Sequence, residues 1–195
     1  HALNVEIGAR AVAISRRSQD PRPIGRMLDE RSFVNAIVGL HATGGSTNHT
    51  LHLPAMAAAA GIELRWDDFA DLSKVVPLLA RIYPNGSADV NHFHAAGGMS
   101  FIMRELLTGG LLDGSAATVW GKSLADYMVE PKLSANGIEF VPAPETSLDM
   151  NTLRPLSQPH QPNGGLAILS GNLGRAVIKI SAVDPTYHRI TAPAA

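Results

Sequence analysis

The stretch SFVNAIVGLHATGGSTNHTLHLPAMAAAAGI, residues 32–62, contains no Asp, Glu, Lys or Arg. Apolar residues recur at helical spacing in its first part, and Asp29 precedes them as a candidate cap, so a helix is predicted to end near Gly44-Gly45. A second helix is predicted to start at Ser46 or Thr47. The stretch therefore indicates two buried helices that meet at a polar turn.

The uncharged stretch does not have the pattern of a membrane span. A spanning helix needs about 20 predominantly apolar residues in a row, and the glycine pair with its polar neighbours interrupts this one. Pro54 is expected to kink or split the second helix, because proline removes a backbone donor. Gly61 is expected to end it.

The polar turn is the most informative place for function. Two glycines let the backbone approach a ligand closely, and the first N–H groups of a helix favour a carboxylate or phosphate. We therefore consider Gly45, Ser46, Thr47 and Asn48 as substrate-binding residues. The alternative is a glycine turn followed by an ordinary helix cap, which is a common arrangement.

The composition of the chain excludes several classes of protein and of binding site. The chain has 195 residues, 45% of them hydrophobic, with 16 basic and 17 acidic residues and a net charge of −1. No basic run is present, so a nucleic-acid-binding surface is not expected. Cysteine is absent, which excludes disulfides and thiolate-ligated metal sites built from this chain and fits a cytoplasmic protein.

The remaining elements predict an α/β chain that is rich in helices at first and in strands at its end. Prolines are frequent between Pro131 and Pro162, which indicates a linker over 131–165 between a helix-rich domain at 1–130 and a β-rich domain at 166–195. Helices are expected at 5–16, 67–76 (capped by Asp67 or Asp68), 99–107 and 123–128. Strands are expected at 62–64, 77–83, 166–169 and 176–183, and a hairpin around 138–141.

Two histidine pairs are candidates for a metal site. His49 and His52 would share a face of a helix, whereas His92 and His94 would share a face of a strand. No carboxylate is spaced to complete either site, so we favour buried imidazoles hydrogen-bonded to the backbone.

A third candidate site follows the glycine turn at residues 171–174. Asn172 lies in this turn, and Arg175 and Lys179 lie on the strand after it. Two cations near a glycine turn can hold a phosphate, with Arg offering two parallel donors. The alternative is a pair of solvated surface charges.

Three stretches together resemble the ILVD/EDD dehydratase family. They are Ala42-Thr43-Gly44-Gly45-Ser46-Thr47-Asn48 with Leu51-His52-Leu53, then Phe93-His94-Ala95-Ala96-Gly97-Gly98, and finally Gly171-Asn172-Leu173 with Ala176-Val177-Ile178-Lys179 and Ser181-Ala182-Val183. The resemblance covers essentially the whole chain. It implies the later part of an N-terminal α/β domain, a linker, and the first strands of a barrel-like C-terminal β domain.

Within the family, the segment from Tyr83 to His94 and the segment Pro162-Asn163-Gly164-Gly165-Leu166 are similar to the branch that dehydrates 6-phosphogluconate. A phosphorylated sugar acid is therefore the expected substrate. The sister activities on dihydroxy acids and other sugar acids are alternatives. A sugar-acid- or phosphate-binding module, or a dimerisation module, without catalytic activity is a further alternative.

The resemblance also implies a cofactor and an assembly. Family members use an iron–sulfur cluster, in some members with a divalent cation, and are commonly homodimers. The cluster cysteines of the family lie upstream of the Gly-Gly-Ser-Thr-Asn turn, so this chain alone is expected to be inactive and is assigned no catalytic or metal-binding residue. Its expected substrate-binding residues are Gly45, Ser46, Thr47, Asn48, Asn91, His92, His94, Asn172, Arg175 and Lys179.

Overall fold

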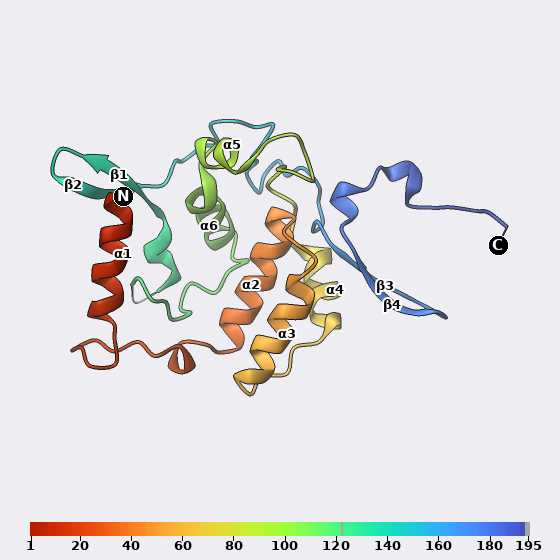
Figure 1. The fold of residues 1–195 in the computed structure, drawn as a ribbon. Coiled ribbons are helices and arrows are strands. Elements are labelled where there is room, and N and C mark those ends of the chain that lie inside the picture. Colours follow the sequence, from red (N-terminus) through yellow and green to blue (C-terminus); the bar gives the residue numbers. More distant parts are fainter. Residues whose placement is uncertain (122, 194–195) are drawn as a thin grey trace.

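A computed structural model describes residues 1–121 and 123–193 as a helical body with a small hairpin at each end (Figure 1). The helices are α1 (Ala2–Ala13), α2 (Glu30–Thr43), α3 (His49–Ala59), α4 (Trp66–Val75), α5 (Val90–Ala95) and α6 (Gly98–Thr108). The strands are β1 (Val129–Ser134), β2 (Gly137–Pro142), β3 (Ala167–Gly171) and β4 (Gly174–Ile178). Short 3-10 helices lie at Ile24–Arg26, Leu124–Tyr127, Ile180–Ala182 and Pro185–Tyr187. The predicted mixture of helices and strands is confirmed.

Helix α2 is the central helix and begins and ends where its sequence predicts. The Asp29 carboxylate accepts a hydrogen bond from the Ser32 N–H at 3.2 Å, which satisfies one of the free donors of the first turn. Gly44 ends the helix with φ +59°, a left-handed conformation that favours glycine. Because both ends are fixed, the position of the polar turn that follows is fixed as well.

The two faces of α2 pack into two apolar clusters. Val38 and Ala42 belong to the first cluster, with Phe101 and Ile102 of α6. The second cluster contains further residues of α2 together with residues from α3, α4 and the start of β3: Phe33, Ile37, Leu40, Leu53, Ala57, Phe69 and Leu166. Helix α2 is therefore packed on two faces, while Glu30, Arg31 and Val34 near its start remain exposed.

An extended segment at residues 77–83 takes the place of the predicted strand. It forms isolated bridges rather than a regular strand, pairing Leu78 with Gln161, Ala80 with Leu153, and Ile82 with Ala88. The Leu79 N–H also donates to the carbonyl of Ala42 at 2.7 Å. This segment is wholly buried from Val76 to Ala80 and joins α2 to residues 152–161, which lie inside the predicted linker.

Several predicted elements differ in the structure. No strand forms at 62–64, and α4 starts at Trp66, where Asp68 accepts a bond from the Arg65 N–H at 2.7 Å instead of serving as the first cap. Pro54 lies inside α3 without splitting it. The segment predicted as a helix at 123–128 forms a single 3-10 turn at Leu124–Tyr127.

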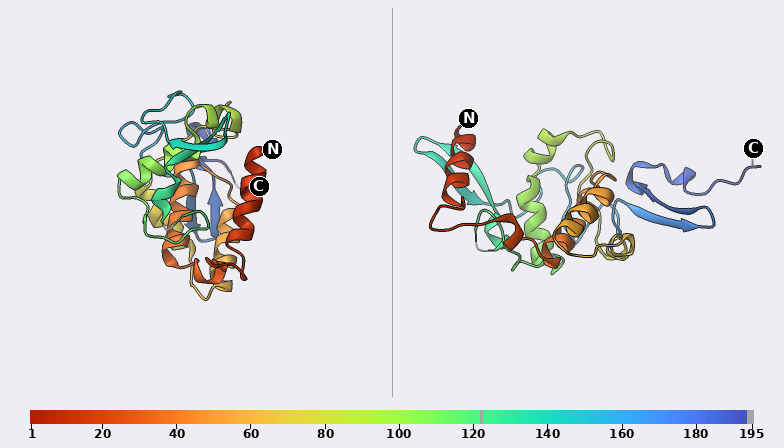
Figure 2. Two further views of the ribbon diagram at one scale, coloured as in Figure 1. Left: turned by 90° about the vertical axis from the view of Figure 1, so that its left-hand side faces the viewer. Right: turned by 60° about the horizontal axis from the view of Figure 1, so that its bottom comes forward.

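Both hairpins are antiparallel and short. The predicted hairpin near 138–141 is confirmed, with β1 pairing β2 from Val129 opposite Pro142 to Ser134 opposite Gly137. Strand β3 pairs β4 from Ala167 opposite Ile178, so β4 ends before the predicted Val183. Figure 2 shows β3 and β4 reaching away from the helical body.

Helix α1 lies against the first hairpin at the opposite end of the molecule (Figure 1). None of its residues is buried. Arg10 of α1 donates hydrogen bonds to the carbonyls of Val119 at 3.0 Å and Trp120 at 2.8 Å, which hold the helix in place. None of the helices formed by the described residues is long and apolar enough to cross a membrane.

The polar turn after α2 is held by a close crossing of two backbone segments. A Cβ added to Gly165 would lie 2.6 Å from the Cα of Gly44 and 2.9 Å from the hydroxyl of Ser181. The Gly165 N–H donates to the carbonyl of His41, and the Ser181 N–H donates to the carbonyl of Gly165, both at 3.2 Å. The start of the second hairpin is thereby packed onto the end of α2.

We predict that Gly165→Ala lowers the free energy of unfolding by about 1–3 kcal/mol, because the new methyl group meets backbone that cannot move aside. The matched control is Gly171→Ala, where a Cβ meets open space and the expected change is within about 0.5 kcal/mol. Urea unfolding followed by circular dichroism measures both. Equal midpoints for the two variants would contradict the crossing.

Candidate functional site

The predicted ligand-binding turn lies between α2 and α3, with Ser46 and Asn48 exposed and Thr47 half-buried. Helix α3 begins at His49, two or three residues later than expected. Asn48 is at the cap position but its side chain makes no capping bond; the Ser46 hydroxyl instead accepts from the Asn48 N–H at 3.2 Å. No side chain at the cap position of α3 therefore forms a capping hydrogen bond.

Free donors remain at this turn. Among the described residues, the N–H groups of Ser46 and Thr47 donate to no protein atom, and the Thr47 hydroxyl has no partner. The Thr47 carbonyl accepts from the Thr50 hydroxyl at 2.8 Å, which fixes the turn. An arrangement of two N–H groups and one hydroxyl at a helix start suits an anionic or hydroxylated ligand.

Asn85 links this turn to a second polar region. It is not among the residues that the sequence predicts for the site. Its amide Nδ2 donates to the Gly44 carbonyl at 2.9 Å, and its Oδ1 accepts from the Ser181 hydroxyl at 2.7 Å. Asn85 is 8% exposed; its bond to Gly44 is buried and its bond with Ser181 is partly buried. The only signal in the sequence is its place in Pro84-Asn85-Gly86, which indicates a turn but gives no partner.

The second polar region is a cleft of about 390 Å³, which we name the arginine cleft. It is lined by residues from the extended segment, the loop after it and the 151–160 region: Arg81, Asn85, Gly86, Ser87, Ala88, Asn151, Thr152, Arg154 and His160. Arg81 and Arg154 form no ion pair with any described residue. The cleft is therefore positively charged.

His160 adds a neutral imidazole to the arginine cleft. Its Nε2 is buried and has no hydrogen-bond partner among the described residues. Burial, and then the positive charges of Arg154 and Arg81, lower the pKa of His160 to about 4. At neutral pH the ring is uncharged, and one of its nitrogens can serve a ligand.

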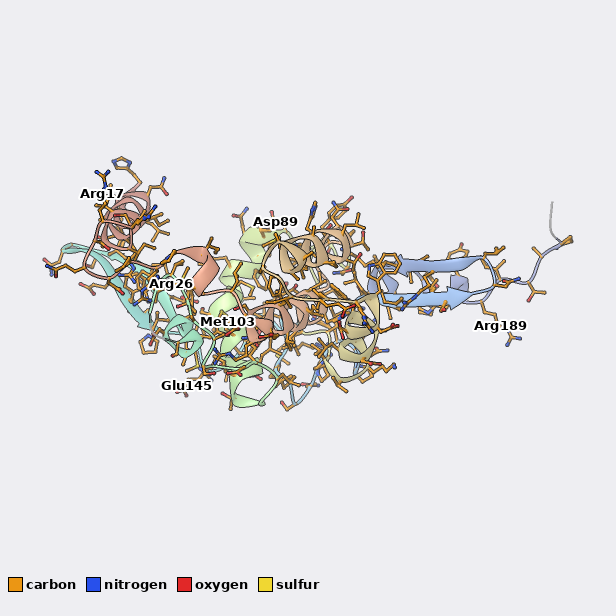
Figure 3. The ribbon with its side chains drawn as sticks, turned by 90° about the horizontal axis from the view of Figure 1, so that it is seen from below. Arg17, Arg26, Asp89, Met103, Glu145 and Arg189 are labelled. Atoms are coloured by element: carbon orange, nitrogen blue, oxygen red, sulfur yellow. The ribbon has the colours of Figure 1, made fainter. Side chains whose placement is uncertain are left out.

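The second histidine pair lies on a helix, so the strand on which the two rings would share a face is not formed. Asp89 starts α5 (Figure 3) and accepts bonds from the N–H groups of Asn91 at 2.8 Å and His92 at 3.0 Å. The His92 ring lies 2.8 Å from the Asp89 carboxylate, so it takes part in the cap. The His94 side chain is exposed on the same short helix.

The favoured alternative of buried imidazoles is also wrong for the four paired histidines, because all four are exposed. His49 and His52 lie together on α3 as predicted, and a ring nitrogen of His49 is 3.1 Å from the Ser46 carbonyl. The buried histidine is His41, whose Nε2 donates to the Phe69 carbonyl at 2.9 Å. Burial lowers the pKa of His41, so it is neutral.

The cationic turn at the second hairpin is separate from the arginine cleft. Arg175 pairs with Asp67 of α4 at 2.5 Å, so its charge is compensated. Asn172 is exposed in the turn between β3 and β4. Lys179 is half-buried, and burial lowers its pKa.

The donor set of this chain does not fit an iron–sulfur cluster. Such clusters are held by cysteine thiolates, and the chain has no cysteine. Within residues 1–121 and 123–193, no three His, Asp or Glu side chains gather closely enough to hold a metal ion.

We predict that His160 makes stability depend on pH. Its pKa is about 4 in the folded chain and near 6.5 when exposed, so the unfolded state takes up the proton first. The contribution to stability is full above pH 6.5 and is lost as the pH falls toward 4. Arg154 and Arg81 strengthen this effect, whereas a hydrogen bond to the Thr152 backbone and then the charge of Asp149 oppose it.

Thermal unfolding between pH 7 and 4 measures this dependence. The melting temperature of His160→Gln should fall less over this range than that of the unchanged protein, whereas His52→Gln, on the exposed surface of α3, should follow the unchanged protein. Parallel curves for His160→Gln and the unchanged protein would contradict the assignment.

Comparison with known proteins gives consistent matches along the chain. The family model described as dihydroxy-acid/6-phosphogluconate dehydratase N-terminal matches residues 1–127, and the corresponding C-terminal model matches residues 151–195. The chain is 57% identical to a phosphogluconate dehydratase of Rhizobium meliloti (strain 1021) and 51% identical to one of Escherichia coli (strain K12). In both comparisons 99% of the chain and 32% of the relative are covered.

A relative from the other branch is also similar. A dihydroxy-acid dehydratase of Roseiflexus sp. (strain RS-1) is 39% identical over 96% of the chain. The chain spans about a third of the length of these curated relatives. Both family models and all three relatives agree: the chain belongs to the ILVD/EDD dehydratase family.

Proposed function

We propose that the full-length protein containing this chain dehydrates 6-phospho-D-gluconate to 2-keto-3-deoxy-6-phosphogluconate. The observation that supports this most is the identity of 50% or more, over nearly the whole chain, to several proteins named phosphogluconate dehydratase. The lower identity to a dihydroxy-acid dehydratase makes that sister activity the second candidate. The expected product is a 2-keto acid in either case.

The reaction removes the proton at C2 of the sugar acid and expels the C3 hydroxyl, and the resulting enol tautomerises to the keto acid. The C2 proton is weakly acidic and hydroxide is a poor leaving group, so Lewis-acid assistance is needed. We infer that an iron–sulfur cluster, with a divalent cation in some family members, supplies it from cysteines outside this chain. None of the residues of this chain is assigned a step in bond breaking.

The role proposed for this chain is to bind and orient the substrate. The turn at Gly45, Ser46, Thr47 and Asn48 offers free donors to the hydroxyl and carboxylate oxygens of the sugar acid. Asn91, His92 and His94 on α5, and Asn172, Arg175 and Lys179 at the second hairpin, remain proposed contacts of the complete enzyme. The Asp67 partner of Arg175 must be displaced before that side chain can bind an anion.

The proposed organisation places the later part of an N-terminal domain at 1–130, a linker at 131–165, and the start of a barrel-like β domain at 166–195. The hairpin of β3 and β4 would be the first two strands of that domain. We further propose a cytoplasmic homodimer, on the basis of the family alone.

An anaerobic assay of the full-length protein tests the proposed activity. Formation of a 2-keto acid from 6-phosphogluconate, faster than from 2,3-dihydroxy-3-methylbutanoate, is the expected result. Faster turnover of the dihydroxy acid would transfer the assignment to the sister branch. No turnover of either substrate by protein with a full complement of cluster would refute a dehydratase of this kind.

We predict that Thr47→Val in the full-length enzyme lowers kcat/KM about tenfold. This corresponds to the loss of one hydrogen bond of about 1.4 kcal/mol from the free hydroxyl to the substrate. Thr108→Val, at the exposed end of α6, is the control and should keep wild-type kinetics. Unchanged kinetics for Thr47→Val would show that the hydroxyl does not contact the substrate.

A further inference from the structure

We propose that the arginine cleft is the subsite for the phosphate group of the substrate, with Arg81 and Arg154 as its cationic donors. The inference rests on the proposed function, and it assigns one end of the substrate to one place in this chain. It also differs from the expectation for the second hairpin, where the charge of Arg175 is already compensated by Asp67.

The charges of the cleft match a phosphate ester. Neither guanidinium has a carboxylate partner among the described residues, and one Arg154 nitrogen donates to the Met150 carbonyl at 3.0 Å while the other two make no bond. A phosphate monoester carries a charge of about −1.5 to −2 at pH 7 and presents three acceptor oxygens. Two uncompensated arginines fit this dianion better than a single carboxylate, because each guanidinium can donate two parallel bonds.

One acidic residue, Asp149, lies close enough to the cleft for its charge to act on His160. Asp149 accepts from the Asn151 N–H at 3.0 Å and from the Thr152 hydroxyl at 2.5 Å, so its oxygens are engaged beside the cleft. It does not line the cleft and is not paired with either arginine.

Neutral donors complete the subsite. Among the described residues, the N–H groups of Gly86 and Ser87 donate to no protein atom, and neither does the Ser87 hydroxyl. Groups of this kind, buried or clustered and lacking a partner, are costly unless a ligand or water satisfies them.

Arg81 and Arg154 lie on backbone segments that are hydrogen-bonded to each other. The Arg81 N–H donates to the Thr152 carbonyl at 2.7 Å, and the Arg154 N–H donates to the Leu79 carbonyl at 2.8 Å, on either side of the bridge between Ala80 and Leu153. Because Ala80 and Leu153 are fully buried, the two cationic side chains start from fixed positions. Less ordering is then needed when an anion binds.

The cleft also adjoins the polar turn through one side chain. Asn85 lines the cleft and at the same time donates to the Gly44 carbonyl, immediately before the free donors of Ser46 and Thr47. A sugar acid has its phosphate at one end and its reacting carbons at the other. The structure thus assigns the phosphate to the cleft and the polyol to the turn.

The test uses the full-length enzyme with Arg81→Gln and Arg154→Gln, and with Arg65→Gln as the control. Arg65 is an exposed arginine paired with Glu63, away from the cleft. The KM for 6-phosphogluconate should rise about ten- to a hundredfold in each cleft variant, as expected when a charge-assisted hydrogen bond is lost, with a smaller change in kcat. The control should match the wild type.

Inorganic phosphate provides a second readout that does not depend on turnover. Phosphate should bind the unchanged protein, compete with the substrate, and bind at least tenfold more weakly to both cleft variants, measured by ³¹P NMR. Arg81→Lys, which keeps the charge but loses the two parallel donors, should recover part of the affinity. Circular dichroism verifies that the variants are folded. Because the Arg81 side chain is exposed, its replacement should disturb the fold least, and Arg81→Gln is therefore the main test.

The outcomes separate the two proposals. If the wild-type enzyme turns over 6-phosphogluconate while both cleft variants keep its KM and its phosphate affinity, the phosphate subsite is overturned and the proposed function stands. If the wild-type enzyme does not turn over 6-phosphogluconate but phosphate binding depends on Arg81 and Arg154, the proposed function fails and the anion subsite stands.

Discussion

The close contact between the backbones of Gly44 and Gly165 holds several separate segments of the chain in place. There is no room for a side chain between them, since a Cβ on Gly165 would lie 2.6 Å from the Gly44 Cα. The crossing joins the end of the central helix to the start of the second hairpin, two segments that are far apart in the sequence. Asn85 and Ser181 complete it with hydrogen bonds, so four segments meet at one place.

This crossing links packing to the candidate site. The polar turn begins at the residue after Gly44, and the loop that carries Asn85 forms one wall of the arginine cleft. Rigid support matters for a binding site, because donors that are already in place lose little freedom when a ligand arrives. The apolar clusters on both faces of α2 provide that support, and the donors themselves lie at the surface of the junction.

Local signals in the sequence predicted local structure well. Asp29 and Gly44 delimit α2 because a cap and a left-handed glycine act within one turn of the helix. His92 and His94 would share a face only on a strand, but Asp89 caps a short helix there, and a cap residue is also a local signal. The arginine cleft could not be predicted, since Arg81 and Arg154 are brought together only by the pairing of buried segments whose register no local pattern reveals.

The glycine pairs show why a motif alone does not locate a ligand. From the sequence, Gly44-Gly45 suggests close approach to a substrate. In the structure, Gly44 meets Asn85 and Gly165, while a Cβ on Gly164 would lie 2.6 Å from the ring of buried His41. These glycines therefore allow close packing between segments of the chain. Among the described residues, this packing leaves the N–H groups of Ser46 and Thr47 without protein partners and the charges of Arg81 and Arg154 without ion pairs. The proposed binding of an anionic ligand rests on these groups rather than on the glycines themselves.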